Sequence, residues 1–336
     1  AMSSPRLPAS LSRFLPDVFT RLLIATVVLA TVLPASGAAV PVVDRVTDVG
    51  IALMFFLYGA RLAPKAVVDG ATHWRLHLLV FASTFALFPL LGLLIGRLPE
   101  AILPHDLAVG LLFLCLLPST IQSSLAFTAI AGGNVPAAMC SATISNLAGT
   151  VVTPALVGLL LSGEQGTPML DAVVQIVELL LLPFALGQIS RPWIGGFVAR
   201  HKSLLGMVDR GTILLVVYGA FGKAVQEGIW HALPPASLGV VLAIEAVLLA
   251  TVLTLTGVAA RAFGFDRADE IAIVFCGSKK SLATGVPMAG VLFAGPTLGT
   301  VLLPVMLFHQ MQLMVCAVLA RRWGAETAEA TAAEAA

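Results

Sequence analysis

Two adjacent lysines, Lys279 and Lys280, interrupt a long run of apolar residues in the C-terminal part of the chain. A charged side chain at the centre of a membrane-spanning helix costs about 2.5–3.5 kcal/mol on insertion scales, so two neighbouring ones indicate a function. Their ammonium groups can attract an anion, replace a bound cation, or release a proton when they are desolvated. The alternative is that both side chains extend along the span and place their amines at the membrane surface.

The residues around this pair predict an interruption of the helix, with Gly277 as the break residue. Successive residues of a helix point about 100° apart, so the two lysine side chains can meet only where the helix unwinds. We therefore expect both ammonium groups to face one hollow in the membrane interior. One would contact a substrate and the other the unwound carbonyls. The candidate binding residues of this segment are Ser278, Lys279, Lys280, Ser281 and Thr284.

A second interruption is predicted at Pro118, in the middle of an earlier apolar run. Proline removes a backbone donor and clashes with the preceding turn, which leaves carbonyls that hydrocarbon cannot satisfy. Such backbone survives at membrane depth only where protein or a wet cavity covers it. The alternative is an ordinary proline kink with hydroxyls bonded back to carbonyls. The candidate binding residues here are Ser119, Thr120, Gln122, Ser123 and Ser124.

Other polar residues inside apolar runs are weaker candidates. His309, Gln310 and Gln312 form a polar patch in the last run, where His309 can shuttle protons. Asn146 is either a ligand or a partner in a hydrogen bond between helices. Glu178 and Glu245 are acids well inside predicted spans, and either can pair with a lysine.

The composition excludes a water-soluble globular protein. Of the 336 residues, 58% are hydrophobic and 11% are charged, and the mean hydropathy is +0.99. The formal net charge of +1 provides no basic field for nucleic acid. The four cysteines lie within apolar runs without a CxxC pattern, so neither a disulfide framework nor a zinc site is expected.

Apolar windows long enough to cross a bilayer, about 20 residues each, predict ten transmembrane helices. The first window can also be interpreted as a secretory signal, because basic residues precede it and small residues follow it. The windows are 17–34, 46–62, 75–96, 107–131, 136–161, 169–190, 208–225, 236–261, 270–293 and 297–320.

The basic residues predict the orientation in the membrane. With the N-terminus in the cytoplasm, fourteen of the nineteen Lys and Arg residues fall on the cytoplasmic side and three on the opposite side. The remaining two are Lys279 and Lys280. Because basic residues favour cytoplasmic loops, we expect both termini in the cytoplasm and the chain in the plasma membrane, the inner membrane of a bacterium.

Two short matches indicate an internal duplication. Tyr58-Gly59-Ala60 recurs as Tyr218-Gly219-Ala220 at an offset of 160 residues, and Gln122–Ala126 matches Lys279–Ala283 at an offset of 157. Five helices per half is an odd number, so the second half enters the membrane from the opposite side. Inverted repeats are typical of secondary transporters, whose sites lie on broken helices at the repeat interface.

This duplication divides the chain into four parts. We expect a cytoplasmic N-terminal segment over 1–16, a first inverted repeat over 17–162 and a second inverted repeat over 168–323. The Ala, Glu and Thr residues of 324–336 predict a disordered C-terminal tail.

At the two predicted breaks the sequence resembles the bile acid:sodium symporter superfamily, and within it the SBF-like branch that includes the vertebrate solute carrier family 10 member 7. The resemblance extends from about 17 to 323, and its most specific parts are Leu116–Ser124, Gly132–Asn134 and Cys276–Ala283. It implies a panel of helices 1, 2, 6 and 7 that moves against a core of helices 3–5 and 8–10. The resemblance also implies that helices 4 and 9 are unwound where they cross, and that Asn146 faces the crossing, where it is a candidate ion or substrate ligand.

The sequence departs from the sodium-coupled members that it resembles. Those members carry a Ser-Asn pair after the first break and a Glu-x-x-x-Gln-Asn-Ser stretch at the second. Here Ser123-Ser124 takes the place of the pair, and Phe275 with Lys279-Lys280-Ser281 takes the place of the stretch. An ammonium group repels a sodium ion in the same pocket. Our hypothesis is that Lys279 replaces the cation or carries a coupling proton.

These observations together predict a secondary active transporter of a small, anionic organic solute that works by alternating access. Its coupling ion is sodium, as the family implies, or a proton, and no other cofactor is expected. Its partners are the substrate and the lipid bilayer, while the oligomeric state does not follow from the sequence. An enzyme is not expected, because the sequence has no metalloprotease motif and no nucleophile elbow. A regulatory membrane protein of the same fold that does not transport is the alternative.

Overall fold

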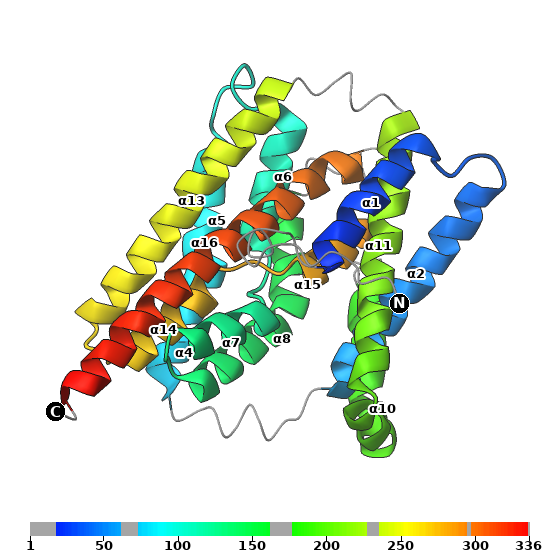
Figure 1. The fold of residues 1–336 in the computed structure, drawn as a ribbon. Helices are drawn as coiled ribbons and strands as arrows, with labels where there is room; N and C mark the ends of the chain where they lie inside the picture. Colours follow the sequence, from blue (N-terminus) through cyan, green and yellow to red (C-terminus); the bar gives the residue numbers. More distant parts are fainter. Residues whose placement is uncertain (1–17, 62–72, 162–176, 227–234, 294–296, 335–336) are drawn as a thin grey trace, which may run out of the picture.

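The computed structural model describes residues 18–61, 73–161, 177–226, 235–293 and 297–334. The regular secondary structure in these ranges is helical throughout (Figure 1). An all-helical fold is therefore confirmed for the part of the chain that is described. The expected N-terminal segment 1–16 and the start of the sixth window, up to residue 176, lie outside these ranges.

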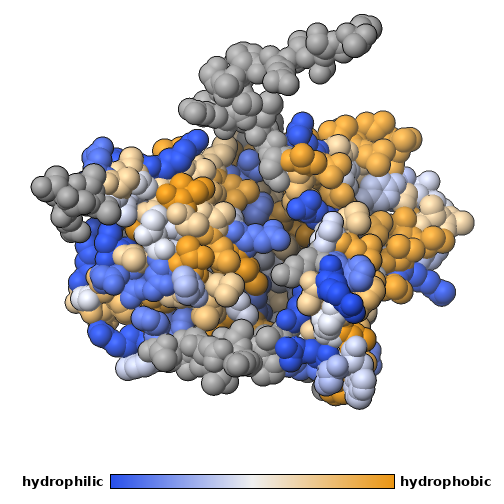
Figure 2. Space-filling view, turned by 60° about the horizontal axis from the view of Figure 1, so that its bottom comes forward, coloured by the Kyte–Doolittle hydropathy of each residue, from blue (hydrophilic) through white to orange (hydrophobic). Residues whose placement is uncertain are grey.

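Five of the described helical units are long and apolar enough to cross a membrane. An interrupted pair, bent by 64°, provides a sixth candidate span. Many apolar side chains are exposed on the molecular surface, as a lipid environment allows, and they appear in orange over large parts of the face shown in Figure 2. The five units are Trp74–Ile95, Val135–Leu160, Ser203–Gln226, Ala236–Ala262 and Thr297–Glu329.

Four helices form a first bundle, on the right of Figure 1. Within it α2 packs along α10, and α11 packs against both α1 and α2. A short π-helix, η3 (Val177–Leu181), leads into α10. The four helices are α1 (Val18–Val32), α2 (Ala39–Arg61), α10 (Leu182–Arg200) and α11 (Lys202–Gln226).

Two glycines let α2 and α10 approach backbone to backbone. A Cβ atom added to Gly59 would overlap the carbonyl of Phe184, and one added to Gly187 would overlap the carbonyl of Phe56. Small residues at such positions let membrane helices pack closely, where the hydrophobic effect between helices is weak. The contact therefore depends on the absence of side chains at these two positions.

The other helices form a second bundle, on the left of Figure 1. A π-helix, η2 (Ser83–Leu87), joins α4 (Trp74–Ala82) to α5 (Phe88–Ile95). The remaining helices are α6 (His105–Leu116), α7 (Ile121–Ile130), α8 (Val135–Leu160), α13 (Pro235–Ala262), α14 (Arg267–Gly277), α15 (Leu282–Leu292) and α16 (Thr297–Glu334).

Two helix pairs in this bundle are interrupted. The first pair is α6 and α7, and Pro118 lies in the non-helical segment between them. The second pair is α14 and α15, and Gly277 is the last residue of α14. New helix starts follow both interruptions, and the Ser281 side chain caps α15 by accepting a hydrogen bond from the Thr284 amide.

The turn before α8 connects the two interrupted pairs at their outer ends. Gly132 has a φ of +75°, a conformation that favours glycine. Gly133 packs closely on Ile271 of α14. Asn134 caps α8, and its amide Nδ2 also donates to Asp269 Oδ1 at 2.7 Å. This turn thereby fixes the position of α14 relative to α7 and α8.

The C-terminal segment differs from the expectation. Helix α16 continues to Glu334, so the prediction of a disordered tail from residue 324 is wrong up to that residue. Alanine and glutamate are strong helix formers and extend a helix that is already nucleated. Thr327 also donates a hydrogen bond to the Ala131 carbonyl at 3.1 Å, which holds the extension against the end of α7.

Candidate functional site

The interrupted helix pairs meet in the middle of the second bundle. The Ser281 amide donates to the Pro118 carbonyl at 2.9 Å, and Thr120 Oγ1 donates to the Lys280 carbonyl at 2.9 Å. Each break therefore supplies a backbone partner to the other, as irregular backbone inside a membrane requires. We call the segments 117–120 and 278–281, with the residues that bind them, the crossing.

Hydroxyl groups of neighbouring helices cover the carbonyls at the end of α14. The last carbonyls of a helix have no partner within the helix. Ser124 Oγ donates to the Phe275 carbonyl at 3.0 Å, and Ser119 Oγ donates to the Cys276 carbonyl at 2.5 Å. Ser83 Oγ, from η2, donates to the Gly277 carbonyl at 2.8 Å. Ser119, Thr120 and Ser124 thus hold the crossing together.

Helix α8 holds the first break from the other side. Ser145 Oγ accepts from the Ser119 amide at 3.1 Å, and Asn146 Nδ2 donates to the Ser119 carbonyl at 2.5 Å. Thr153 Oγ1 donates to the Leu116 carbonyl at 2.7 Å. Asn146 therefore faces the crossing, where it binds the backbone. Gly149 of the same helix contacts the ring of Pro118.

The Lys280 ammonium group is buried among carbonyl oxygens. Its Nζ donates to the carbonyls of Thr84 at 2.9 Å, Cys115 at 2.8 Å and Leu117 at 2.6 Å. It also lies 4.1 Å from the ring centre of Phe88. The side chain is 1% exposed, so the charge is compensated by backbone dipoles and an aromatic face.

Gln312 of α16 fixes the backbone of Lys280. Its Oε1 accepts from the Lys280 amide at 2.9 Å, and its Nε2 donates to the Lys280 carbonyl at 2.8 Å. His309 Nδ1 lies 3.1 Å from the same Nε2. His309 thereby supports the glutamine that holds the second break. Gln310 faces the first bundle instead, where its Oε1 accepts from Thr20 of α1 at 3.0 Å.

The Lys279 ammonium group has different surroundings. Its Nζ lies 4.0 Å from the ring centre of Phe127 and 5.1 Å from that of Phe275. The residue is 0% exposed, and its Nζ has no hydrogen-bond partner in the described part of the chain. Ser123, one helical turn before Phe127, has a buried hydroxyl that also lacks a partner there. Lys279 is thus a buried cation held by aromatic faces.

The two lysines therefore do not share one hollow, and that expectation is wrong. Their ammonium groups face different aromatic rings, that of Phe127 for Lys279 and that of Phe88 for Lys280. Neither Glu178 nor Glu245 forms an ion pair with a lysine among the described residues. Glu178 is exposed, and both carboxylate oxygens of buried Glu245 lack hydrogen-bond partners in the described ranges.

The remaining candidate residues have mixed positions. Gln122 is exposed at the first break, and Thr284 is buried with an Oγ1 that lacks a hydrogen-bond partner among the described residues. Ser278 is buried at the end of α14, next to the thiol of Cys316. Sequence reasoning placed Asn146 of α8 at the crossing, but it missed Ser145, Gly149 and Thr153 of the same helix. Their signal was a stripe of small residues at a spacing of four: Ser141, Ser145, Gly149 and Thr153.

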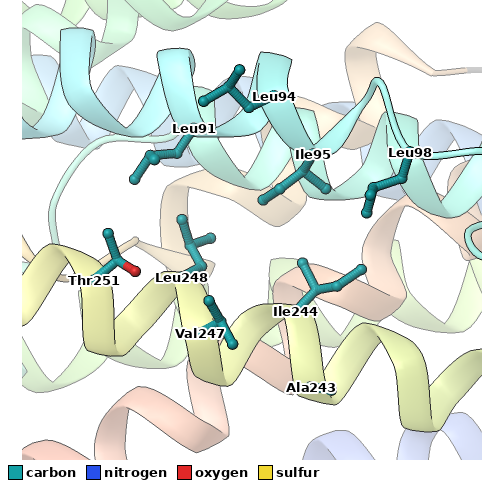
Figure 3. Close-up of a pocket in the computed structure, with 9 residues that line it drawn as sticks. All are labelled: Leu91, Leu94, Ile95, Leu98, Ala243, Ile244, Val247, Leu248 and Thr251. Carbon is teal, nitrogen blue, oxygen red and sulfur yellow. The ribbon is translucent and has the colours of Figure 1, made fainter.

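A separate pocket lies between α5 and α13 (Figure 3). Its volume is about 360 Å³, and aliphatic side chains such as Leu91, Leu98 and Ile244 line it, with Thr251 as its polar residue. It contains no charged side chain that would bind an anion. The two buried lysines lie at the crossing and do not line this pocket.

The family model that describes the SBF-like CPA transporter family matches residues 17–325. The chain is 57% identical to an uncharacterized protein of Pseudomonas aeruginosa over 96% of this chain and 97% of the other. It is 50% identical to the Escherichia coli protein named "Putative symporter YfeH" over 93% and 94% of the two chains.

The resemblance extends to vertebrates. The chain is 30% identical to "Sodium/bile acid cotransporter 7" of Rattus norvegicus over 82% of each chain. The Escherichia coli and rat relatives are named as a symporter and a cotransporter, and none of the three relatives is named as an enzyme. Together with the apolar helices, the match over most of the sequence shows an integral membrane protein. The chain belongs to the SBF-like CPA transporter family.

Proposed function

We propose that the protein is a secondary active transporter that carries a small organic anion by alternating access, with the anion bound at Lys279. The observation that carries this proposal is a fully buried ammonium group without a hydrogen-bond partner in the described residues. A buried charge that lacks hydrogen bonds is costly, and an anionic ligand would remove that cost.

The surroundings of Lys279 suit such a ligand. The N-termini of α7 and α15 begin at the two breaks, and helix N-termini attract negative charge. The free hydroxyl of Ser123 can donate a further hydrogen bond to an anionic oxygen. Phe127 and Phe275 provide apolar faces for the organic part of the solute.

We further propose ten transmembrane helices in two inverted repeats, 17–162 and 168–323. Helices or interrupted pairs of the described chain overlap all ten apolar windows, and the interruptions fall in the fourth and ninth. The separate bundle of α1, α2, α10 and α11 supports a panel of helices 1, 2, 6 and 7. The distribution of basic residues favours both termini in the cytoplasm, in the inner membrane of a bacterium.

The molecular surface supports movement of one bundle against the other. Figure 2 shows a face that is hollowed near its centre, between the left and right parts of the molecule. This face carries the end of α2 and the start of α4 (Figure 1), where basic residues predict the cytoplasmic side. We infer that the structure represents a state open to the cytoplasm. The driving ion is a proton or, as the name of the rat relative suggests, sodium.

The test uses Lys279→Met, which keeps the length of the side chain without its charge. Thermal unfolding of purified protein is measured with acetate, benzoate, succinate and taurocholate, and any stabilising anion is then tested for flux into proteoliposomes. We expect an anion that stabilises and crosses with the wild type to do neither with Lys279→Met. Arg97, an exposed basic residue after α5 and outside the crossing, provides the control Arg97→Met, which should behave as wild type. Unchanged anion binding and flux in Lys279→Met would contradict the proposal.

A further inference from the structure

Three backbone carbonyls around Lys280 have lost their helical partners, and the sequence explains each loss. In a π-helix the carbonyl of Thr84 pairs with the amide five residues later, which is Pro89 and has no N–H. The amide of Phe88, its α-helical partner, donates to Ser83 instead. The Thr84 carbonyl is therefore free to accept from another group.

The other two carbonyls are freed by the first break. The amide four residues after Cys115 belongs to Ser119, and it donates to Ser145. The residue three positions after Cys115 is Pro118, which has no N–H. Leu117 has extended backbone, so its carbonyl points away from the helix axis. All three oxygens face one point, which the Lys280 ammonium group occupies.

A set of converging carbonyl oxygens without a carboxylate is the ligand set of a weakly held monovalent cation. The aromatic face of Phe88, 4.1 Å from Nζ, adds a further attraction for positive charge. Gln312 holds the Lys280 backbone by two hydrogen bonds, so the side chain is aimed at these oxygens. The ammonium group thus has the position that a bound cation would have.

We propose that this is a monovalent cation site which the protein fills with its own side chain, so that the crossing is assembled without a free cation. The tethered charge is thus that of Lys280, whereas the sequence led us to expect Lys279 in that role. The cation site deepens the proposed function. The site itself does not depend on that function, but the expectation that flux needs no sodium rests on it. Anion flux in the wild type should therefore not require sodium.

The test removes the side chain and supplies cations from solution. Purified Lys280→Ala is unfolded by heat in choline chloride and in sodium, potassium, ammonium or propylammonium chloride at one ionic strength. We expect ammonium and propylammonium to raise the unfolding midpoint of this variant by several degrees above its value in choline. The wild type and the control Lys279→Ala should show no such difference, since their three carbonyls are occupied.

Equal unfolding midpoints of Lys280→Ala in all five salts would overturn the proposal. So would a wild-type midpoint that rises as much in ammonium and propylammonium as that of the variant. If Lys280→Ala does not fold, Lys280→Met and Lys279→Met are compared. The first should be clearly less stable than wild type because it leaves three carbonyls unpaired, and the second should not be. Equal stability of Lys280→Met and wild type would also overturn the proposal.

This experiment separates the two proposals because unfolding does not depend on transport. If cations stabilise Lys280→Ala while the wild type carries no anion, only the transporter function is contradicted. A protein that carries anions while its Lys280→Ala variant ignores cations would contradict the cation site alone. Flux that needs sodium in the wild type would overturn the consequence for coupling.

Discussion

At the scale of single residues, the two lysines show that identical side chains next to each other can have different surroundings. Lys280 has three hydrogen-bond acceptors and Lys279 has none among the described residues. Aromatic faces attract a desolvated ammonium group by about 2 kcal/mol or more, but they leave its donors unused. Lys280 is therefore part of the framework, and Lys279 keeps its capacity for a ligand.

Glu245 gives a prediction at this scale. It is 0% exposed, its helix face carries the buried residues Val241 and Leu248, and its oxygens lack partners in the described chain. A buried polar group without a hydrogen bond costs roughly 1–3 kcal/mol. We expect Glu245→Leu to raise the free energy of unfolding by about this amount, measured by denaturant titration in detergent. A less stable variant would mean that the carboxyl group has a partner or is required for packing.

At the scale of secondary structure elements, prolines decide where the backbone needs outside partners. Pro89 lies in α5 and Pro118 lies between α6 and α7, yet neither can offer an N–H to the nearby carbonyls of Thr84 and Cys115, which are now bound to Lys280. A helix that loses such bonds inside a membrane requires another donor. The π-helix and the first break are thus completed by one side chain from the second break.

Pro89→Ala tests this dependence. The variant restores an amide at the position that pairs with Thr84 in a π-helix, so it should compensate in part for the loss of the ammonium group. We expect Lys280→Met to be destabilised less in a Pro89→Ala background than alone, with a coupling energy of about 1 kcal/mol. Denaturant titration of the wild type, the two single variants and the double variant measures this energy. Additive effects would show that the Thr84 carbonyl does not depend on Lys280.

The contact between α2 and α10 gives a second prediction for the elements. A methyl group at position 187 would overlap the Phe56 carbonyl, so Gly187→Ala must push the two helices apart. We expect a loss of about 1–3 kcal/mol in the free energy of unfolding, the usual cost of overpacking. Gly196 of the same helix has open space around it and provides the control Gly196→Ala, which should be neutral or slightly stabilising. Equal stability of the two variants would show that α2 and α10 do not pack this closely.

At the scale of the whole molecule, the two bundles touch through few elements. Helix α11 of the first bundle packs on α15 and α16 of the second, and Thr20 of α1 bonds to Gln310 of α16. The crossing lies entirely within the second bundle, so it can move as a unit relative to the first. This arrangement is what transport by movement of a rigid core requires.

A cross-link between the bundles tests that movement. The polar atoms of Thr20 and Gln310 lie 3.0 Å apart, so Thr20→Cys with Gln310→Cys can be joined by a short bifunctional thiol reagent. We expect the cross-link to abolish the flux of any transported anion, and reduction of a cleavable reagent to restore it. The variants Thr20→Cys and Gln310→Cys, each with one cysteine added to the four native ones and treated in the same way, are the controls. Undiminished flux in the cross-linked protein would contradict movement between the bundles.

The sequence by itself determined the all-helical membrane class, because apolar length and local backbone chemistry act within one segment. For the same reason Pro118 and Gly277 identified the segments 117–120 and 278–281, where the structure is non-helical. The sequence did not determine the partners of the lysines, since Thr84 lies 196 residues from Lys280. Only the tertiary structure decided which ammonium group the free carbonyls bind, because that depends on how separate helices pack. The same applies to residue 324 onward, where contact with α7 accompanies a helix instead of the expected disorder.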